Sequence, residues 1–391
     1  MTRRRIMISA GEESGDLHGA ALLDKAKEIA PHLTFSGLGG DRMAKSGAEL
    51  LAHMKNTAVM GVAEIFGSFG KILAIRKSLV EHMERERPDA LVLVDFPDFN
   101  FHLAKKATAL NIPVIYYICP QVWAWREGRL KFLRKNTRRR ALIFPFELKF
   151  YEERGLDADL VGHPLLDEME FKPKPASRAA LGLPPGGRTL ALLPGSRAKL
   201  FAKLAPAVFG AAEILRADFP DLTVAAALAP SLPRRLADET LEAFPRDFAK
   251  SVILYEGRSQ ELLNASDAAL LASGTSALEG AILGVPMVVA YKMNFLSYLL
   301  AKLLVKIPRV SLPNIVLGSA AVPELIQGKA TAENLADALK PFLADPAARE
   351  RTAKNLASVR EALGGPGASE KVVNIILEET GDREKTGGAR G

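Results

Sequence analysis

The chain has 391 residues, of which 48% are hydrophobic and 25% charged, and its formal net charge is +7. This length exceeds one ordinary hydrophobic core and predicts two domains, while the composition excludes a disordered chain. A single cysteine, Cys119, excludes an internal disulfide framework and favours a reducing compartment. The first apolar run, residues 6–10, is too short for a signal-peptide core, and no run is long enough to predict a membrane-spanning helix.

Apolar runs alternate with helical patterns along the chain. The strands expected in the first half are 6–10, 90–96, 114–118 and 141–146, and those in the second half are 189–195, 223–229, 252–257, 268–273 and 286–291. Strands that are apolar on both faces and separated by helices are typical of parallel, doubly wound sheets. We therefore predict an α/β protein with two Rossmann-like domains that face each other across a cleft.

The segment 171–187 between the two halves is rich in proline and glycine, which predicts a linker. The expected divisions are an N-terminal domain of residues 1–170 and a second Rossmann-like domain of residues 171–345. Helices in residues 346–391 are expected to pack back toward the N-terminal domain and to end in a polar tail.

The best candidate acid or base lies in VDFPDFNFH (94–102), where an apolar strand ends. Ligands of open α/β sheets bind at the carboxyl ends of the strands, so Asp95 and Asp98 are expected to project toward a ligand. Asp98, beyond the proline, is the predicted general base, with partial burial raising its pKa. Asp95 is expected to orient the turn or to bond a ligand hydroxyl. The alternative is that both carboxylates only cap the helix that starts near Asn100.

A second polar turn, PGSRAK (194–199), follows the first strand of the second half. Its Gly195 and Ser196 offer a tight backbone turn, and Arg197 is suited to pair with a diphosphate through two hydrogen bonds. The alternative is a surface arginine at a helix start, where its charge is unfavourable. The turn matches neither Gly-x-Gly-x-x-Gly nor a Walker A loop, which disfavours a dinucleotide.

The segment 270–289 has a strand, a Ser-Gly-Thr-Ser turn, a small-residue helix and a second strand. Ser273, Gly274 and Thr275 offer donors at the positive end of a helix dipole, which favours a phosphate. Glu279 lies inside the helix, where it is placed to accept hydrogen bonds from ribose hydroxyls. An ordinary βαβ unit is the alternative.

The basic and amphipathic segments of the chain are compatible with several kinds of binding partner. Residues 126–140 hold eight basic residues and one acid, which fits nucleic acid, anionic lipid, a phosphorylated substrate or a solvated face. Nucleic acid is the weakest of these, since no nucleic-acid motif accompanies the cluster. The segments 60–79 and 294–308 predict basic amphipathic helices that lie on an anionic bilayer or pack in the core.

No metal site or cofactor is expected. The six histidines lack paired-ligand spacing. Asp157-Ala158-Asp159 has the Asp-x-Asp form of some metal-dependent sugar transferases, but its short polar context favours a turn. His163 in VGHPLLD is interpreted as structural.

Ten segments together resemble the lipid-A-disaccharide synthases, a family of inverting glycosyltransferases of Gram-negative envelope synthesis. They cover nearly the whole chain, and PQVWAWR and LLASGTSALE are far more specific than a generic Rossmann turn. The segments are GEESGD (11–16), GLGGDRM (37–43), AVMGVAEI (58–65), VDFPDFN (94–100), PQVWAWR (120–126), FPFE (144–147), GHP (162–164), LLPGSR (192–197), LLASGTSALE (270–279) and SLPN (311–314).

The resemblance implies a GT-B fold and a metal-independent reaction between two lipid-linked sugars. The donor is UDP-2,3-diacylglucosamine and the acceptor is 2,3-diacylglucosamine 1-phosphate (lipid X), and the products are UDP and a β-1′,6-linked disaccharide phosphate. By the same resemblance, Asp98 deprotonates the acceptor 6-hydroxyl and Arg197 lies near the UDP diphosphate. The nucleotide site then comprises Gly195, Ser196, Ser273, Gly274, Thr275, Glu279 and Asn314.

Family members are peripheral proteins of the cytoplasmic face of the inner membrane, and some are dimers with exchanged C-terminal parts. The resemblance therefore also implies contact with anionic phospholipid and allows a homodimer. One departure is visible: the family commonly has a glutamate shortly after LPGSR, whereas this chain reads LPGSRAKLFAK. The alternatives are another UDP-N-acetylglucosamine transferase or epimerase of GT-B fold, and a non-catalytic sugar-nucleotide or lipid binder.

Overall fold

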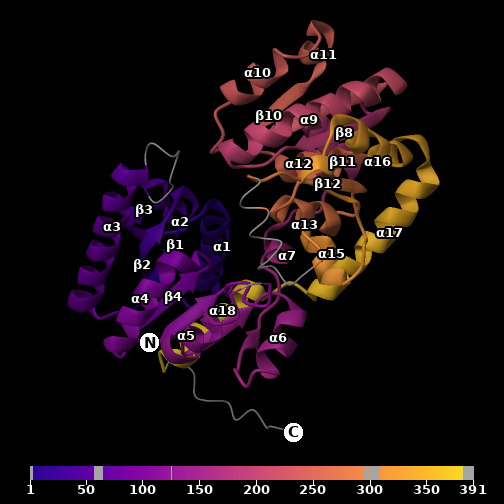
Figure 1. Ribbon diagram of the computed structural model, residues 1–391. Helices are drawn as coiled ribbons and strands as arrows, with labels where there is room; N and C mark the ends of the chain where they lie inside the picture. Colours follow the sequence, from indigo (N-terminus) through magenta and orange to yellow (C-terminus); the bar gives the residue numbers. More distant parts are fainter. Residues whose placement is uncertain (1–2, 57–64, 125, 295–297, 299–307, 382–391) are drawn as a thin grey trace. The chain divides into compact units, whose positions relative to one another are not determined.

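The computed structural model describes residues 3–56, 65–124, 126–294, 298 and 308–381, and it divides into two compact units (Figure 1). Unit 1 comprises Met1–Glu168 and Leu363–Gly391, and unit 2 comprises Met169–Ala362. The C-terminal region expected as one piece, 346–391, thus divides near Leu363. Helix α17 (Pro346–Leu363) belongs to unit 2, and α18 (Ala368–Glu379) belongs to unit 1.

Unit 1 is built on a parallel sheet with the spatial order β3-β2-β1-β4-β5-β6-β7. The first six strands have the Rossmann order, in which the chain runs outward from β1 in one direction and then from β4 in the other. The strands are β1 (Arg4–Ala10), β2 (Leu33–Gly39), β3 (Glu49–His53), β4 (Ala90–Val94), β5 (Val114–Tyr117), β6 (Arg139–Leu142) and β7 (Asp159–Leu160).

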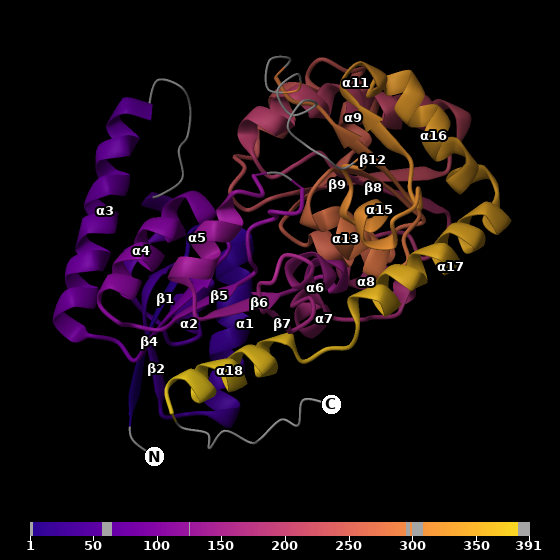
Figure 2. The same ribbon diagram turned by 60° about the horizontal axis from the view of Figure 1, so that its bottom comes forward.

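Helices cover both faces of this sheet (Figure 2). On one face, buried residues of α3, α4, α5 and α6 form a continuous core with β1, β2, β4, β5 and β6. On the other face α1 packs against α18 and α2. The helices of unit 1 are α1 (Glu13–Ile29), α2 (Asp41–Lys45), η1 (Met54–Asn56), α3 (Ile65–Glu86), α4 (Pro97–Ala109), α5 (Arg129–Asn136), α6 (Pro145–Glu152), α7 (Leu165–Glu168) and α18.

Unit 2 repeats this architecture with the parallel order β10-β9-β8-β11-β12-β13, again the Rossmann order. Buried residues of α9, α10 and α16 form a core on one face of the sheet. The strands are β8 (Arg188–Leu193), β9 (Leu222–Leu228), β10 (Ile253–Glu256), β11 (Ala268–Ala272), β12 (Met287–Tyr291) and β13 (Glu324–Ile326). The helices are α8 (Lys174–Leu181), α9 (Ala198–Asp218), α10 (Arg235–Leu241), α11 (Arg246–Ser251), α12 (Ser259–Ala265), α13 (Thr275–Ile282), α15 (Leu312–Leu317), η2 (Gln327–Lys329), α16 (Ala332–Ala344) and α17.

The segment 171–187, expected as a linker, is part of unit 2. It contains α8, and Arg178 on that helix is buried. The Arg178 guanidinium donates to the carbonyl of Ala265 at 3.0 Å and to the carboxylate of Asp267 at 2.7 Å. A buried arginine paired in this way fixes the segment to the sheet, and Pro173 and Pro175 mark the start of α8 rather than a linker.

Candidate active site

The switch point of unit 1 lies between β1 and β4, where consecutive crossovers leave in opposite directions. The chain continues from β1 into Gly11 and from β4 into Asp95 and Phe96. A Cβ atom at Gly11 would lie 2.1 Å from the Phe96 ring, so only glycine lets these two turns approach. Asp98 follows as the second residue of α4. The carboxylate predicted as the base therefore stands where doubly wound sheets bind their ligands.

A hydrogen-bond network holds the turn before Asp98 in an unusual shape. Asp95 and Phe96 both have left-handed backbone angles, with φ of 45° and 49°. The Asp95 carbonyl accepts hydrogen bonds from the Asn100 amide at 2.8 Å and from the Tyr116 hydroxyl at 2.9 Å. The Ser9 hydroxyl in turn donates to Asn100 at 2.7 Å. Strained backbone of this kind persists only where its surroundings enforce it, which is typical of functional sites.

The Asp98 side chain is 80% exposed, which differs from the partial burial expected. Its carboxylate forms ion pairs with Arg129 and, at 3.6 Å, with Arg126. The Arg129 guanidinium also lies 5.2 Å from the centre of the Phe101 ring. Arg126 in the β5–α5 connection and Arg129 at the start of α5 therefore orient Asp98, whose exposed surface is open to a ligand.

A buried glutamate links two motifs of unit 1. The Glu147 carboxylate accepts a hydrogen bond from the Trp123 indole at 2.9 Å and from the backbone N–H groups of Ile143 and Phe144 at 3.3 and 3.1 Å. Burial raises the pKa of Glu147 to about 7, against the lowering effect of these donors. Glu147 thus fixes Trp123 and the connection that follows β5.

Three other motif residues have structural roles. Asp16 is buried and accepts hydrogen bonds from the N–H groups of Gly40, Arg42 and Met43 at the start of α2. Asp159 lies on strand β7 rather than in the turn expected, and its carboxylate pairs with Arg139 at 2.7 Å.

His163 is also buried, and burial lowers its pKa to about 3. Its Nδ1 accepts the Leu165 N–H at 3.2 Å, and its ring packs against Phe144. These contacts fit the structural interpretation.

The switch point of unit 2 lies between β8 and β11 and brings together the two polar turns predicted for a phosphate. Gly195 has φ of +115°, and a Cβ atom there would lie 3.5 Å from the Ala272 side chain at the end of β11. The N-termini of α9 and α13 follow directly, and neither has a side-chain cap. Two positive helix ends at one sheet edge favour the binding of an anion.

The predicted ligand residues are accessible at this edge. Ser196, Arg197 and Gly274 are exposed, while Ser273, Thr275 and Glu279 are half-buried. Arg197 is the N-cap residue of α9. Leu200, three residues after Arg197, packs on the core at the position where the family often carries a glutamate, and no acid occurs in residues 198–203.

Asn314 lies beneath the second turn and its amide is engaged inside the protein. The side chain is 2% exposed, and it donates to the Val322 carbonyl at 2.9 Å and to Glu324 at 2.8 Å. Its oxygen accepts the Val322 N–H at 2.9 Å. Asn314 therefore braces the loop, a different position from the direct ligand contact predicted.

Glu324, which sequence reasoning missed, is the centre of this network. It accepts hydrogen bonds from the Val310 N–H at 3.1 Å, the Ser311 N–H at 2.9 Å and the Ser311 hydroxyl at 2.6 Å. The Val310 carbonyl accepts the Ser273 hydroxyl at 3.0 Å. The Glu324 carboxylate on β13 therefore positions the Val310–Ser311 segment, and this segment in turn positions the turn at Ser273.

Most of the basic cluster at 126–140 is engaged in the fold. Six of its eight cations bond to carboxylates or backbone carbonyls of unit 1. These are Arg126, Arg129, Arg134, Arg138, Arg139 and Arg140. Lys131 and Lys135 are exposed and have no such partner within the described part of the chain. The cluster is therefore mainly a set of structural arginines rather than a continuous binding face.

The two predicted amphipathic segments are described only in part. Residues 57–64, 295–297 and 299–307 lie outside the described residues. In α3, Ile72 packs against the core and Leu73 is exposed. Over the described residues, no helix combines the length and apolarity needed to cross a bilayer, and no group of three metal-binding side chains is found.

Comparisons with known proteins now bear on this geometry. The sequence model of a family described as lipid-A-disaccharide synthetase matches residues 6–375. The lipid-A-disaccharide synthase of Anaeromyxobacter sp. (strain K) is 43% identical over 373 residues, 95% of this chain and 97% of that protein. The chain belongs to the lipid-A-disaccharide synthase family. That of Geobacter sulfurreducens is 42% identical over 381 residues, 97% of this chain and 98% of that protein. The predicted family is confirmed, and the chain is a glycosyltransferase.

Solved structures of low identity share the fold. The S. aureus MnaA–UDP structure has a TM-score of 0.69 at 14% identity and covers 99% of this chain and 100% of that chain. Acinetobacter baumannii MurG has a TM-score of 0.59 at 15% identity, covering 96% and 99%. These likenesses concern the fold alone, and they confirm the predicted α/β class with two Rossmann-like domains of GT-B type.

Proposed function

We propose that this family member transfers 2,3-diacylglucosamine from UDP-2,3-diacylglucosamine to the 6-hydroxyl of lipid X, with inversion. The observation that carries the proposal is the exposed Asp98 carboxylate, set by a strained turn and two arginines at the switch point of unit 1. A general base needs this kind of fixed and accessible carboxylate.

The leaving group is assigned to the switch point of unit 2. Negative charge grows on the diphosphate as the bond from the anomeric carbon to the phosphate oxygen breaks. Arg197 and the two turns, with the N-termini of α9 and α13, would stabilise that charge. Glu279, half-buried in the second turn of α13, is our ribose contact.

Bond formation is assigned to unit 1. The acceptor 6-hydroxyl oxygen attacks the anomeric carbon of the donor as UDP leaves, and the hydroxyl proton passes to Asp98. Attack on the face opposite to the leaving group inverts the configuration. Arg126, the more exposed of the two arginines that pair with Asp98, is our candidate for contact with the phosphate of an acceptor bound there.

Glu324→Gln is expected to weaken UDP binding about tenfold, since a hydrogen bond to a charged group contributes about 1.5–3 kcal/mol. The amide would replace one carboxylate oxygen by a donor and leave part of the Val310–Ser311 segment unpaired. Calorimetric titration with UDP measures the effect. Glu256→Gln, an exposed glutamate at the end of edge strand β10, is the control. Equal UDP affinity in both variants would refute the bracing role of Glu324.

The proposed substrates carry acyl chains, so we also propose attachment to the cytoplasmic face of the inner membrane through α3. The exposed Leu73 and the basic residues of α3 support this placement. Helices of this kind lie in the interface of an anionic bilayer. A homodimer stays a prediction.

The test is an assay with UDP-2,3-diacylglucosamine and lipid X that follows UDP release and disaccharide mass. We expect one disaccharide to form for each UDP released. The rate should not change when EDTA is added, because the stabilisation of the leaving-group charge is assigned to Arg197 and the helix N-termini. A loss of activity in EDTA would overturn the metal-independent mechanism. Full activity with a soluble, non-acylated acceptor would favour another UDP-sugar enzyme, and binding without product would favour a non-catalytic binder.

A further inference from the structure

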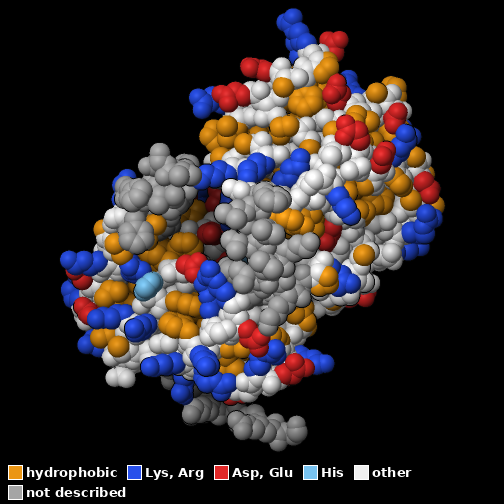
Figure 3. Space-filling model, viewed as in Figure 1, with side chains coloured by type: hydrophobic (Ala, Val, Ile, Leu, Met, Phe, Trp, Pro, Cys, Tyr) orange, Lys and Arg blue, Asp and Glu red, His pale blue; other side chains and the backbone are white. Residues whose placement is uncertain are grey.

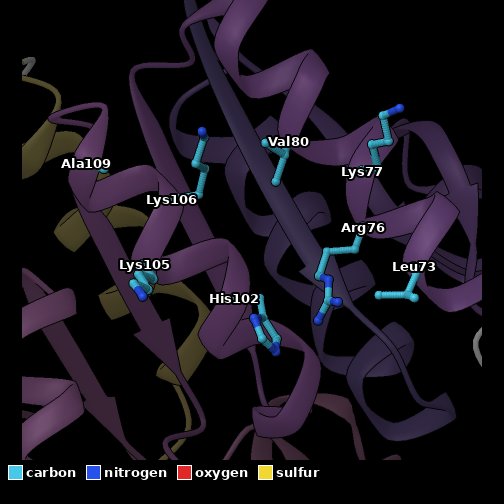
Figure 4. Close-up of a pocket in the computed structure, with 8 residues that line it drawn as sticks. All are labelled: Leu73, Arg76, Lys77, Val80, His102, Lys105, Lys106 and Ala109. Atoms are coloured by element: carbon cyan, nitrogen blue, oxygen red, sulfur yellow. The ribbon is translucent and has the colours of Figure 1, made fainter. Parts of the chain in front are cut away.

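Two helices of unit 1 present matched stripes of side chains to a common groove (Figure 4). The groove has a volume of about 480 Å³, within the about 300–1,000 Å³ typical of small-molecule sites. Its lining repeats at i, i+3, i+4 and i+7 on each helix, which is one helical face. The stripe of α3 is Leu73, Arg76, Lys77 and Val80, and that of α4 is His102, Lys105, Lys106 and Ala109.

Among the described residues, the lining is cationic and apolar and contains no acid. Figure 4 shows Arg76 and His102 turned toward the same space, while Lys77 extends away. Figure 3 shows Lys or Arg, a histidine and hydrophobic side chains together over these helices. Leu73, Val80 and Ala109 supply the apolar part of the groove. An anion with an apolar body complements this surface in both charge and polarity.

Some cations of the groove already pair with carboxylates of the protein, and others do not. Lys106 pairs with Glu84 at 2.6 Å, and Lys77 lies 3.8 Å from Glu81. Within the described part of the chain, Arg76 and Lys105 have no carboxylate in ion-pair range. Burial lowers the pKa of His102, and the charges of Arg76 and Lys105 lower it further. Arg76 of α3 and Lys105 of α4 therefore supply the unpaired positive charge of the groove, and the lowered pKa of His102 favours its neutral form.

The 126–140 cluster provides the contrast. That cluster has more cations in sequence, but six of its eight side chains bond to carboxylates or carbonyls of the fold. An external anion would have to compete with these partners for the arginines. In the α3–α4 groove, by contrast, Arg76 and Lys105 have no such competitor among the described residues, and they lie beside apolar side chains in one hollow.

We propose that the α3–α4 groove is a binding site for the headgroup phosphate of an anionic bilayer phospholipid. Arg76 and Lys105 hold the phosphate oxygens, His102 donates a further hydrogen bond, and Leu73 and Val80 contact the apolar part of the lipid. This inference rests on the membrane attachment proposed above and goes beyond it by naming a defined site.

The test is co-sedimentation of the full chain with vesicles of phosphatidylcholine alone or of an equimolar mixture with phosphatidylglycerol. The double variant Arg76→Gln/Lys105→Gln is expected to bind the mixed vesicles about 30-fold more weakly, on about 1 kcal/mol per basic residue at an anionic surface. Lys131→Gln/Lys135→Gln removes the same charge from exposed positions of the 126–140 cluster and is expected to bind like the parent chain.

Transferase activity in detergent micelles should be unchanged in both double variants, which shows that they fold. Equal loss of vesicle binding in the two would overturn the inference, since binding would then follow net charge alone. Displacement from vesicles by millimolar glycerol 3-phosphate, beyond the effect of matched salt, would also overturn it in favour of a soluble phosphate site. If the parent chain makes no disaccharide but its vesicle binding depends on Arg76 and Lys105, the proposed reaction fails and this inference stands.

Discussion

Asp98→Asn is expected to lower kcat by about 10²–10⁴-fold, the usual contribution of a general base. Asparagine keeps the size of the side chain and the hydrogen bonds it accepts, but it cannot take the proton of the acceptor hydroxyl. The affinity for UDP should not change, because the diphosphate is assigned to unit 2. Initial rates of UDP release and calorimetric titration with UDP measure the two quantities.

The competing interpretation, in which Asp98 only caps α4, predicts a different pattern. A carboxylate in the first turn of a helix contributes about 0.3–1 kcal/mol through the helix dipole. Glu333 occupies the equivalent second position of α16 and is exposed, so Glu333→Gln is the matched control. Both variants should unfold at slightly lower temperature, but only Asp98→Asn should lose turnover. Near-normal turnover in Asp98→Asn would place the base elsewhere.

The strands of the two sheet centres could be predicted from the sequence because burial on both faces makes them continuously apolar. Each of the nine expected strands overlaps an observed strand, but the one expected at 141–146 does so only at its start, since β6 ends at Leu142 and α6 begins at Pro145. The missed strands lack that signal. β3, β7 and β13 are short and only partly buried, and β2 contains a serine and two glycines.

The residues of the candidate site also differ in whether their signal is local in the sequence. Asp98 and Arg197 could be proposed because each is a polar residue that closely follows a buried strand. Their supports could not, since these depend on side chains distant in sequence. Arg129 meets Asp98 across 31 residues, and Ser273 of the second turn meets Val310 across 37. The basic cluster was ambiguous for the same reason: its charges were visible in the sequence and their partners were not.

Arg197→Ala is expected to lower kcat/KM by about 10²–10³-fold, as for removal of one preorganised donor to a developing charge. The guanidinium would pair with the diphosphate most strongly when the leaving group carries its full charge, so kcat should fall more than KM rises. Arg197→Lys keeps the charge but loses the bidentate geometry, and it should recover only part of the rate. Steady-state kinetics with the donor varied at saturating lipid X measure these effects.

The ligand dependence of the loss decides what Arg197 contacts. If the arginine pairs with the diphosphate, Arg197→Ala should strongly lower the affinity for UDP. The affinity for uridine should hardly change, because uridine has no phosphate for the arginine to contact. An equal loss for both ligands would mean that the variant disturbs the N-terminus of α9 and the turn at Gly195 rather than a phosphate contact. Arg235→Ala, which removes an exposed arginine at the start of α10, should leave the affinity for either ligand unchanged. A diphosphate contact at Arg197, together with loss of turnover in Asp98→Asn, would assign charge stabilisation to unit 2 and proton transfer to unit 1.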